Sequence, residues 1–299
     1  MAKLFKRFAK HRDALRSTIA SVRGNIGKSI PVLQQARAID HENFRAVRNV
    51  MNLMGRERAN VDRLYTAINL IADCKPAADP IIRSLLSSSE SQLCQDILCV
   101  LAFNQKRSGY FVEIGVGEGK SISNTYLLEK DFDWKGLLIE PCRSFHASIK
   151  KQRKAILDKR AASSSQSGEI EFSEATDNGE FSFTANAKDA SGKAPAKKQY
   201  ETYQVPTTTL DAVLTEHGAP TKIDFISLDT EGSERDILDG LNLDKYQIGL
   251  FCIEHNQRPG ALADFDALLL PRGYRRILPL VSNYDAFYLH KSVISDHLF

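Results

Sequence analysis

Apolar positions in the second half of the chain follow two alternating patterns, one typical of buried strands and one typical of helices. Short runs of β-favouring residues are separated by segments whose apolar residues recur at helical spacing. The predicted strands cover residues 111–114, 135–140, 155–162, 222–229 and 247–254. The predicted helices cover residues 88–103, 121–130, 143–154, 207–214, 231–240 and 262–270. This alternation predicts a Rossmann-like α/β fold, doubly wound around a mostly parallel sheet.

Two segments depart from this alternation. Residues 275–281 (RRILPLV) and 285–290 (DAFYLH) predict an antiparallel hairpin at the end of the sheet. Residues 163–203 are irregular and rich in Gly, Ser and Lys, with two short β-like pieces, GEIEF and GEFSF. Long irregular segments within a domain are usually functional lids or mobile loops. We expect a hairpin near residues 181–183 that covers the site, and a mobile stretch over residues 187–198.

The first 87 residues predict helices only. One helical face precedes Pro31, and Asp40 is a suitable N-cap for a second helix that extends to about residue 74. At 1.5 Å per residue this helix would be roughly 50 Å long. We therefore divide the chain into an all-helical N-terminal region, residues 1–87, and an α/β domain, residues 88–299.

An apolar seam runs along the second of these helices. Its members fall on alternating steps of three and four residues, with interruptions at Gly55 and Arg58: Phe44, Val47, Met51, Met54, Val61, Tyr65 and Ile68. An exposed stripe of this kind is rare on soluble monomers. We expect it to pack within a homodimer, while packing against the chain's own α/β domain is the alternative.

A glycine-rich turn follows the first predicted strand and carries the first candidate chemistry. Gly115, Gly117 and Gly119 allow the backbone to bend sharply and approach a ligand, directly after a strand that contains Glu113. The dinucleotide fingerprint GxGxxG would need a glycine at position 120, which is lysine here. The spacing favours S-adenosylmethionine over NAD. We expect Glu113, the three glycines and Ser121, at the start of the next predicted helix, to contact it.

The second predicted strand ends in an acid, Glu140, which lies 25 residues after Gly115 and precedes Pro141. A carboxylate at this strand end can accept two hydrogen bonds from a ribose diol. We therefore assign Glu140 and Pro141 to the ribose of the cofactor.

Acidic residues also follow the two later parallel strands. Asp229, Glu231 and Glu254, with His255 beside them, should converge at the carboxyl edge of the sheet, where such folds bind ligands. Asp229 and His255 are the preferred candidates for a general base, and Glu231 is a third. Asp229 should also border the cofactor. A divalent cation held by Asp229, Glu231 and Glu254 is an open alternative. Glu234 is expected only to stabilise a helix N-terminus.

Composition and charge indicate which partners and which location to expect for this chain. The chain has 42% hydrophobic and 26% charged residues and a net charge of +3, and it lacks a zinc-type cysteine spacing, so nucleic acid is not an expected partner. No apolar run approaches the length of a membrane span. Five scattered cysteines indicate a reducing, cytoplasmic location. Residues 1–12 carry five basic residues and no acid, which favours a solvated terminus over a weak contact with anionic membrane.

Five motifs, in order, make residues 91–290 resemble the FkbM family of S-adenosylmethionine-dependent methyltransferases. They are SQLCQD, FVEIGVGEGKSISNT, LLIEPCRSFHASI, VPTTTLDAVL and IDFISLDTEGSERDILDG. The resemblance implies a seven-stranded class I methyltransferase fold, with residues 88–299 as the catalytic domain, and O-methyl transfer, often to a sugar hydroxyl. Two positions depart from the family pattern. Residue 113 is Glu where Asp is more usual, and Ala162 and Ser163 stand where an acid would bind the adenine amino group, so only Ala162 is retained there as a cofactor contact.

The sequence disfavours two rival functions. An NAD-dependent oxidoreductase of Rossmann type is disfavoured by the glycine spacing and by the lack of a recognisable hydride-transfer pair. A non-catalytic helical scaffold with a vestigial methyltransferase domain is disfavoured because Gly115, Gly117, Glu140 and Asp229 are all intact.

Overall fold

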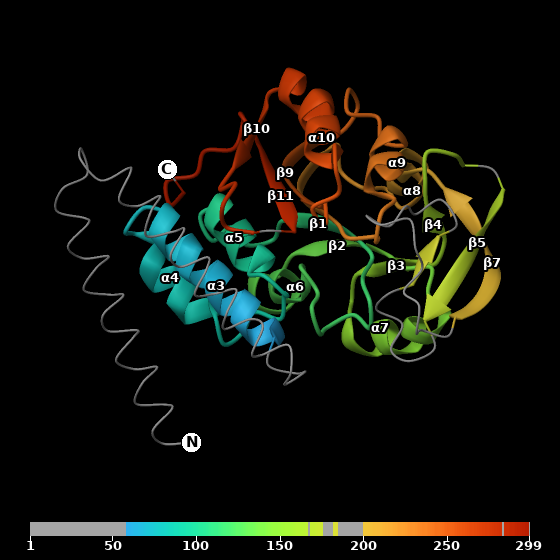
Figure 1. The fold of residues 1–299 in the computed structure, drawn as a ribbon, viewed down its shortest axis with the longest axis horizontal. Helices are drawn as coiled ribbons and strands as arrows, with labels where there is room; N and C mark the ends of the chain where they lie inside the picture. Colours follow the sequence, from blue (N-terminus) through green and yellow to red (C-terminus); the bar gives the residue numbers. More distant parts are fainter. Residues whose placement is uncertain (1–57, 167, 176–181, 185–199, 283, 299) are drawn as a thin grey trace. The chain divides into compact units, whose positions relative to one another are not determined.

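Seven strands form the central sheet of the computed structural model, which describes residues 58–298 except 167, 176–181, 185–199 and 283. The strand order is β10-β11-β9-β8-β1-β2-β3 (Figure 1). In chain order the strands are β1 (Tyr110–Ile114), β2 (Lys135–Ile139), β3 (Ile156–Asp158), β8 (Lys222–Leu228), β9 (Gln247–Glu254), β10 (Tyr274–Ile277) and β11 (Asp285–His290). The doubly wound, mostly parallel seven-stranded sheet of a class I methyltransferase is therefore confirmed.

The direction of winding reverses at β1. The chain adds β2 and β3 in parallel on one side of β1, and then returns to add β8 and β9 in parallel on the other side. β11 pairs antiparallel with both β9 and β10, which confirms the predicted terminal hairpin. Ligands of open α/β sheets bind at such a reversal, beyond the carboxyl ends of the strands. Here that point lies between β1 and β8.

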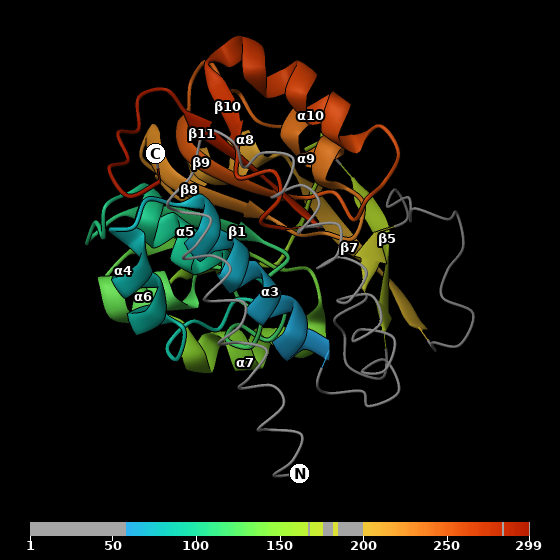
Figure 2. The same cartoon turned by 60° about the vertical axis from the view of Figure 1, so that its left-hand side comes forward.

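Helices cover both faces of the sheet, because alternate residues of each strand are apolar on opposite sides (Figure 2). Phe111 of β1 packs on one face with helices α3 (Arg58–Asp73), α4 (Ala78–Leu85), α5 (Gln95–Ala102), α6 (Tyr126–Phe132) and α7 (His146–Gln152). Val112 and Ile114 pack on the other face with α8 (Leu210–Glu216), α9 (Glu234–Asp239) and α10 (Ala261–Leu269). Short 3-10 helices, η3 (Arg143–Phe145) and η4 (Leu270–Arg272), flank α7 and α10.

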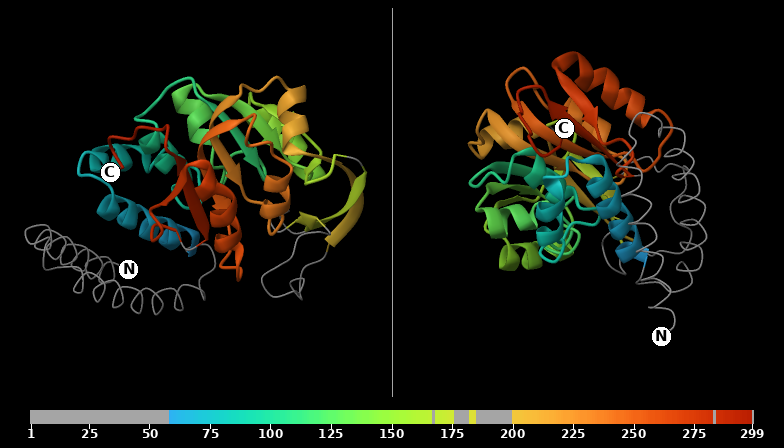
Figure 3. Two further views of the ribbon diagram at one scale, coloured as in Figure 1. Left: turned by 90° about the horizontal axis from the view of Figure 1, so that it is seen from above. Right: turned by 90° about the vertical axis from the view of Figure 1, so that its left-hand side faces the viewer.

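A second sheet of four strands lies beyond the β3 edge of the first (Figures 1 and 3). Its order is β4-β7-β5-β6, from β4 (Ala161–Ala162), β5 (Glu169–Ala175), β6 (Phe183–Thr184) and β7 (Tyr200–Thr208). The sequence predicted mainly irregular chain here, with one strand over 155–162 that the structure divides between the two sheets. The expected hairpin corresponds to β5 and β6, which pair antiparallel. The stretch expected to be mobile, 187–198, lies outside the described residues.

The described part of the N-terminal region packs on the α/β core. Residues 62–299 form one compact unit, so the predicted boundary after residue 87 does not coincide with a boundary between compact units. Ala67 and Leu70 of α3 are buried, as is Cys74 directly after it, whereas the seam residues Tyr65 and Ile68 are only half-buried. The remaining seam side chains and residues 1–12 lie outside the described residues.

Among the described helices, none is long and apolar enough to cross a membrane.

Candidate functional site

The glycine turn, residues 115–119, lies where the winding reverses. Gly115, Gly117 and Gly119 have φ angles of +79°, +61° and +100°, a region that other residues adopt at a cost. A Cβ atom on Gly115 would lie 1.7 Å from the carbonyl oxygen of Asp229. The turn therefore packs directly against the end of β8. By contrast, a Cβ atom on Gly117 would meet no atom within 4 Å, so the turn has open space on this side.

Glu140 follows β2 and is held by the glycine turn. Its Oε2 accepts hydrogen bonds from the backbone N–H groups of Val116 (2.8 Å) and Gly117 (2.9 Å), and its Oε1 accepts one from Cys142 (2.8 Å). Each carboxylate oxygen has two acceptor positions, so one position on Oε1 is left for a ligand. The sequence predicted two hydrogen bonds from the ribose to Glu140. Both could form only if one of the backbone hydrogen bonds to this carboxylate were broken. Burial raises the pKa of Glu140 to about 7. Pro141 beside it is half-buried.

Glu113 is buried beneath the loop that follows the glycine turn. Its carboxylate accepts hydrogen bonds from Ser123 Oγ, from the Asn124 N–H (2.6 Å) and from Thr125 Oγ1 (2.6 Å), and it pairs with the guanidinium of Arg153 at 3.4 Å. These bonds hold residues 121–125 as a loop. Helix α6 consequently begins at Tyr126, later than the predicted start at residue 121. Because Glu113 holds this loop, it has a positioning role under the turn.

Arg153 fastens the same loop to the sheet. Its side chain is fully buried, pairs with Glu129 at 2.9 Å and donates to the carbonyl oxygen of Gly119 at 3.1 Å. Ser121, predicted to contact the cofactor, is exposed at the outer side of this loop, and its N–H donates to Glu118 Oε1. Direct contact of Glu113 and Ser121 with the cofactor stays a prediction.

Asn124 is a site candidate that sequence reasoning missed. Its side-chain amide donates to Ser227 Oγ at 2.9 Å, and only 4% of the residue is exposed. Its Oδ1 is buried and has no hydrogen-bond partner. Buried polar atoms are normally satisfied, so this acceptor beside the glycine turn is available to a ligand donor. In the sequence, the one indication of this role is the position of Asn124 shortly after the glycine turn.

Three carboxylates gather at the ends of β8, β9 and β11. Asp229 directly follows β8, Glu254 ends β9, and Asp285 begins β11 opposite Glu254 in the ladder. Glu231 follows Asp229 with a φ angle of +56°. We call these four residues, Asp229, Glu231, Glu254 and Asp285, the carboxylate cluster. Asp285 was not predicted as a site residue, although the first residue of an antiparallel strand lies at the same sheet edge as the last residue of its parallel neighbours.

Burial and mutual repulsion raise the pKa values of Asp229 and Glu254 within the carboxylate cluster. Burial raises the pKa of Asp229 well above its ordinary value, the charges of Glu231 and Asp285 raise it further, and a hydrogen bond with Glu254 opposes the shift. Burial and the Asp229 charge likewise raise the pKa of Glu254. Asp229 is half-buried and Glu254 is buried, and two neighbouring carboxylates do not ionise independently, so these two titrate as a pair. The Oε2 atom of Glu254 is buried without a hydrogen-bond partner.

Asp285 is held in place by two neutral donors. Gln95 Nε2, at the start of α5, and Ser282 Oγ each donate to Asp285 Oδ2 at 3.0 Å. Burial raises the pKa of Asp285 to about 6. Gln95 thus connects the segment before β1 with the carboxylate cluster, a link that the sequence did not predict.

His255 lies beside the carboxylate cluster as a neutral side chain. Burial and the nearby charges of Arg258 and Arg276 lower its pKa. The backbone N–H of Gln257 donates to its Nδ1 at 3.0 Å, so the remaining ring proton is assigned to Nε2. In this tautomer His255 offers a donor rather than a base, and the geometry favours Asp229 between the two predicted bases.

Glu234 has a structural role, as expected. It is fully buried at the start of α9, accepts hydrogen bonds from the backbone N–H groups of Thr230 (3.0 Å) and Gly232 (3.1 Å), and pairs with Arg258. These contacts fix the loop that carries Glu231.

Two further predictions concern a metal and the adenine ring. In the part of the chain that the structure describes, no group of three or more His, Cys, Asp or Glu residues is arranged to hold a metal ion. A cation at Asp229, Glu231 and Glu254 stays a prediction. Ala162 lies in β4, is 7% exposed and joins the apolar core on the α8 side of the sheet. It brings no polar group to an adenine ring.

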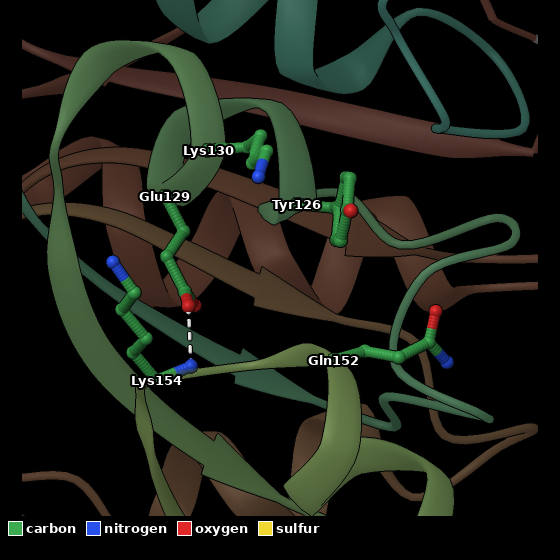
Figure 4. A pocket seen from close by; sticks show the side chains of 5 residues that line it. All are labelled: Tyr126, Glu129, Lys130, Gln152 and Lys154. Carbon is green, nitrogen blue, oxygen red and sulfur yellow. Dashed lines mark hydrogen bonds between the residues drawn. The ribbon is translucent and has the colours of Figure 1, made fainter.

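A small pocket of about 110 Å³ lies between α6 and the end of α7 (Figure 4). Its lining consists of Tyr126, Glu129, Lys130, Gln152 and Lys154. None of the predicted site residues lines it, although Gln152 donates a hydrogen bond to the carbonyl oxygen of Glu118 in the glycine turn at 3.2 Å.

The sequence from residue 113 to residue 276 matches the family model described as the Methyltransferase FkbM domain. This segment runs from Glu113 through the glycine turn to β10, and it is more than half of the 299 residues. The chain belongs to the FkbM methyltransferase family. Membership in this family confirms the predicted class of enzyme and its methyl donor, S-adenosylmethionine. No curated protein matches the FkbM chain in sequence.

Two solved structures show a distant likeness to this FkbM protein. One is MtNAS in complex with MTA and tNA, with 12% identity, a TM-score of 0.33, and coverage of 93% of this chain and 97% of that chain. The other is the plantazolicin methyltransferase BpumL in complex with SAH, with 10% identity, a TM-score of 0.32, and coverage of 80% and 100%.

Proposed function

We propose that this FkbM protein methylates a hydroxyl group of a sugar, in a glycan or a glycosylated small molecule. S-adenosylmethionine supplies an electrophilic methyl group on its sulfonium. One observation carries the proposal: the glycine turn and Asp229 meet so closely that a Cβ on Gly115 would lie 1.7 Å from the Asp229 carbonyl oxygen. The ligand-binding turn and the candidate base are therefore neighbours at the reversal of the sheet.

The residues around the glycine turn fit the cofactor. Gly117 borders open space that a side chain would fill, and Glu140 retains one acceptor position for a ribose hydroxyl. The unpartnered Oδ1 of Asn124 can accept a hydrogen bond from the amino acid end of the ligand. The tight contact of Gly115 with Asp229 fixes this arrangement relative to β8.

Asp229 is the proposed general base. Methyl transfer is an in-line displacement, so the protein must align the acceptor oxygen and help to remove its proton. A carboxylate with a raised pKa is a stronger base than an ordinary one, and Glu254 can share the proton that Asp229 accepts.

A sugar hydroxyl as the acceptor rests on the family resemblance of the sequence. The carboxylate cluster is compatible with it, since hydroxyl groups donate hydrogen bonds to carboxylates. A transferred methyl group on a sugar hydroxyl forms an ether, which distinguishes the product from a methylated carboxylate or amine.

The test measures transfer of a labelled methyl group from S-adenosylmethionine to a panel of mono- and oligosaccharides. We expect label in an alkali-stable ether. Asp229→Asn keeps the shape of the side chain but not its charge, so turnover should fall by at least about 10²-fold, while affinity for S-adenosylhomocysteine and the melting temperature change little. Asp244→Asn, at an exposed position remote from the glycine turn, is the matched control. Near-normal turnover by Asp229→Asn would instead implicate His255.

We also propose a cytoplasmic homodimer that pairs through the N-terminal seam. All five cysteines are buried and free, in keeping with a reducing compartment. The seam repeats at heptad spacing over residues 44–68 and has more apolar length than α3 uses for packing on its own core. Membrane contact by residues 1–12 stays a prediction.

A further inference from the structure

The carboxylate cluster concentrates negative charge at one edge of the sheet. Asp229, Glu231, Glu254 and Asp285 lie at the ends of three adjacent strands, β8, β9 and β11, or in the loop that follows β8. Arg258, a nearby cation, is already paired with Glu234. Gln95 and Ser282, which hold Asp285, are neutral donors that leave its charge in place.

One member of the cluster has an unsatisfied atom. Glu254 is 8% exposed, and its Oε2 is buried without a hydrogen-bond partner. A buried carboxylate oxygen without a donor is costly unless a positive group approaches it. The arrangement therefore points to a cationic ligand group that arrives at this edge.

The position of the glycine turn indicates which group this is. The inference rests on the proposed function, in which the ribose lies at Glu140 beyond β2 and the ligand crosses Gly117 beyond β1. β8 lies two strand spacings from β2, roughly 10 Å away across β1, so a ligand that extends from Glu140 across Gly117 is directed toward the end of β8. Asp229 lies at that end, in contact with Gly115. The sulfonium of S-adenosylmethionine is bonded to the 5′ carbon of the ribose and carries a positive charge.

We propose that Asp229 and Glu254 recognise the positive charge of the methyl donor and so distinguish S-adenosylmethionine from its product. Transfer of the methyl group leaves a neutral sulfur in S-adenosylhomocysteine, which removes the attraction. The carboxylate cluster then favours exchange of product for a new donor molecule. In this role Glu254 sets ligand specificity through charge.

The test compares three ligands that differ at a single centre. S-adenosylmethionine carries a sulfonium, sinefungin a protonated amine, and S-adenosylhomocysteine a neutral sulfur. Calorimetric titration of the full chain gives a dissociation constant for each. We expect Glu254→Gln, which keeps shape but removes the charge, to weaken binding of the two cationic ligands by about tenfold, or ~1.4 kcal/mol, and to leave S-adenosylhomocysteine nearly unchanged.

Two variants complete the design. Glu171→Gln removes a carboxylate from an exposed position on β5, away from the cluster, and should retain the ligand preference of the parent chain. If Glu254→Gln does not fold, Asp285→Asn removes charge from the same cluster and should shift the preference in the same direction.

The outcomes separate this inference from the proposed function. If Glu254→Gln changes the three affinities equally, or changes none, charge recognition by the cluster is overturned even though the cofactor site stands. If the parent chain binds none of the three ligands, the assignment of the cofactor site at the glycine turn is wrong, and the inference falls with it.

Discussion

Glu140 accepts hydrogen bonds from the backbone of the glycine turn and has one acceptor position left, which we propose binds the cofactor. Its burial has a consequence for stability. The pKa of an unfolded glutamate is about 4.5, and burial raises that of Glu140 to about 7. Between these values the folded chain holds a proton that the unfolded chain releases. The contribution of protonated Glu140 to the free energy of unfolding is therefore fully present below about pH 4.5, and it is lost as the pH rises to about 7.

The Glu140→Gln variant tests this linkage. Its side chain cannot ionise, so its free energy of unfolding should decrease less than that of the parent between pH 4.5 and 7, by up to about 3 kcal/mol. Denaturant unfolding of the ligand-free proteins at several pH values measures the difference. Asp285, whose pKa is raised to about 6, contributes equally to both proteins and cancels. Superimposable pH profiles would contradict a buried, protonatable Glu140.

At the residue scale, the sequence was enough to predict the acidic residues of the site, but not the hydrogen bonds that hold its other polar residues. Asp229, Glu140 and Glu254 were found because each ends a predicted strand, and all three lie at the carboxyl edge of the sheet. Asn124 and Gln95 were not assigned because their importance depends on single partners, Ser227 and Asp285, that lie more than 100 residues away in the chain. The position of the proton on the His255 ring was also not predicted, because it depends on one hydrogen bond from the backbone N–H of Gln257.

The glycine turn is the element on which the cofactor site depends, and two of its glycines serve different purposes. At Gly115 a side chain would collide with the backbone at Asp229, whereas at Gly117 it would enter open space. Gly115 is thus required by packing, whereas Gly117 is proposed to leave space for the ligand.

Alanine substitutions should separate these purposes. Gly115→Ala should destabilise the fold by about 3 kcal/mol or more, because strain and overlap act together. Gly117→Ala adds backbone strain of about 1–2 kcal/mol and should remain folded, yet lose affinity for S-adenosylhomocysteine, since its methyl group occupies ligand space. Thermal unfolding and titration calorimetry measure the two effects. Equal cofactor affinity in Gly117→Ala and the parent would place the ligand elsewhere.

At the element scale, periodicity predicted the buried strands and the terminal hairpin because their apolar positions follow the sheet directly. Periodicity gave a wrong prediction where hydrogen bonds from particular side chains determine the conformation of the backbone. The loop over residues 121–125 was predicted as helix, but Glu113 and Arg153 hold its backbone and side chains in a different conformation. The second sheet was missed because β5 and β7 pair across 24 intervening residues with an irregular composition.

The whole molecule consists of a methyltransferase unit and an N-terminal region that carries the seam. Helix α3 packs on the unit through Ala67 and Leu70, while the described seam residues Tyr65 and Ile68 are half-buried. The heptad spacing of the seam in the sequence is the reason for expecting a homodimer.

Light scattering of the full chain tests the dimer. Met51→Glu places a charge in the centre of the predicted seam and should yield monomers, because a buried unpaired charge is strongly destabilising. Asn49→Glu introduces the same charge on the opposite face of the predicted helix and should leave the dimer intact. A monomeric parent chain would exclude pairing through the seam.

Calorimetric titration of the full chain with S-adenosylmethionine, S-adenosylhomocysteine and NAD tests the central claim most directly. A methyltransferase site at the glycine turn predicts saturable binding of both S-adenosyl ligands, with each affinity reduced by about 1.5–3 kcal/mol in Glu140→Ala, and no binding of NAD. Binding of NAD in place of the S-adenosyl ligands, or S-adenosyl affinities that Glu140→Ala leaves unchanged, would contradict it.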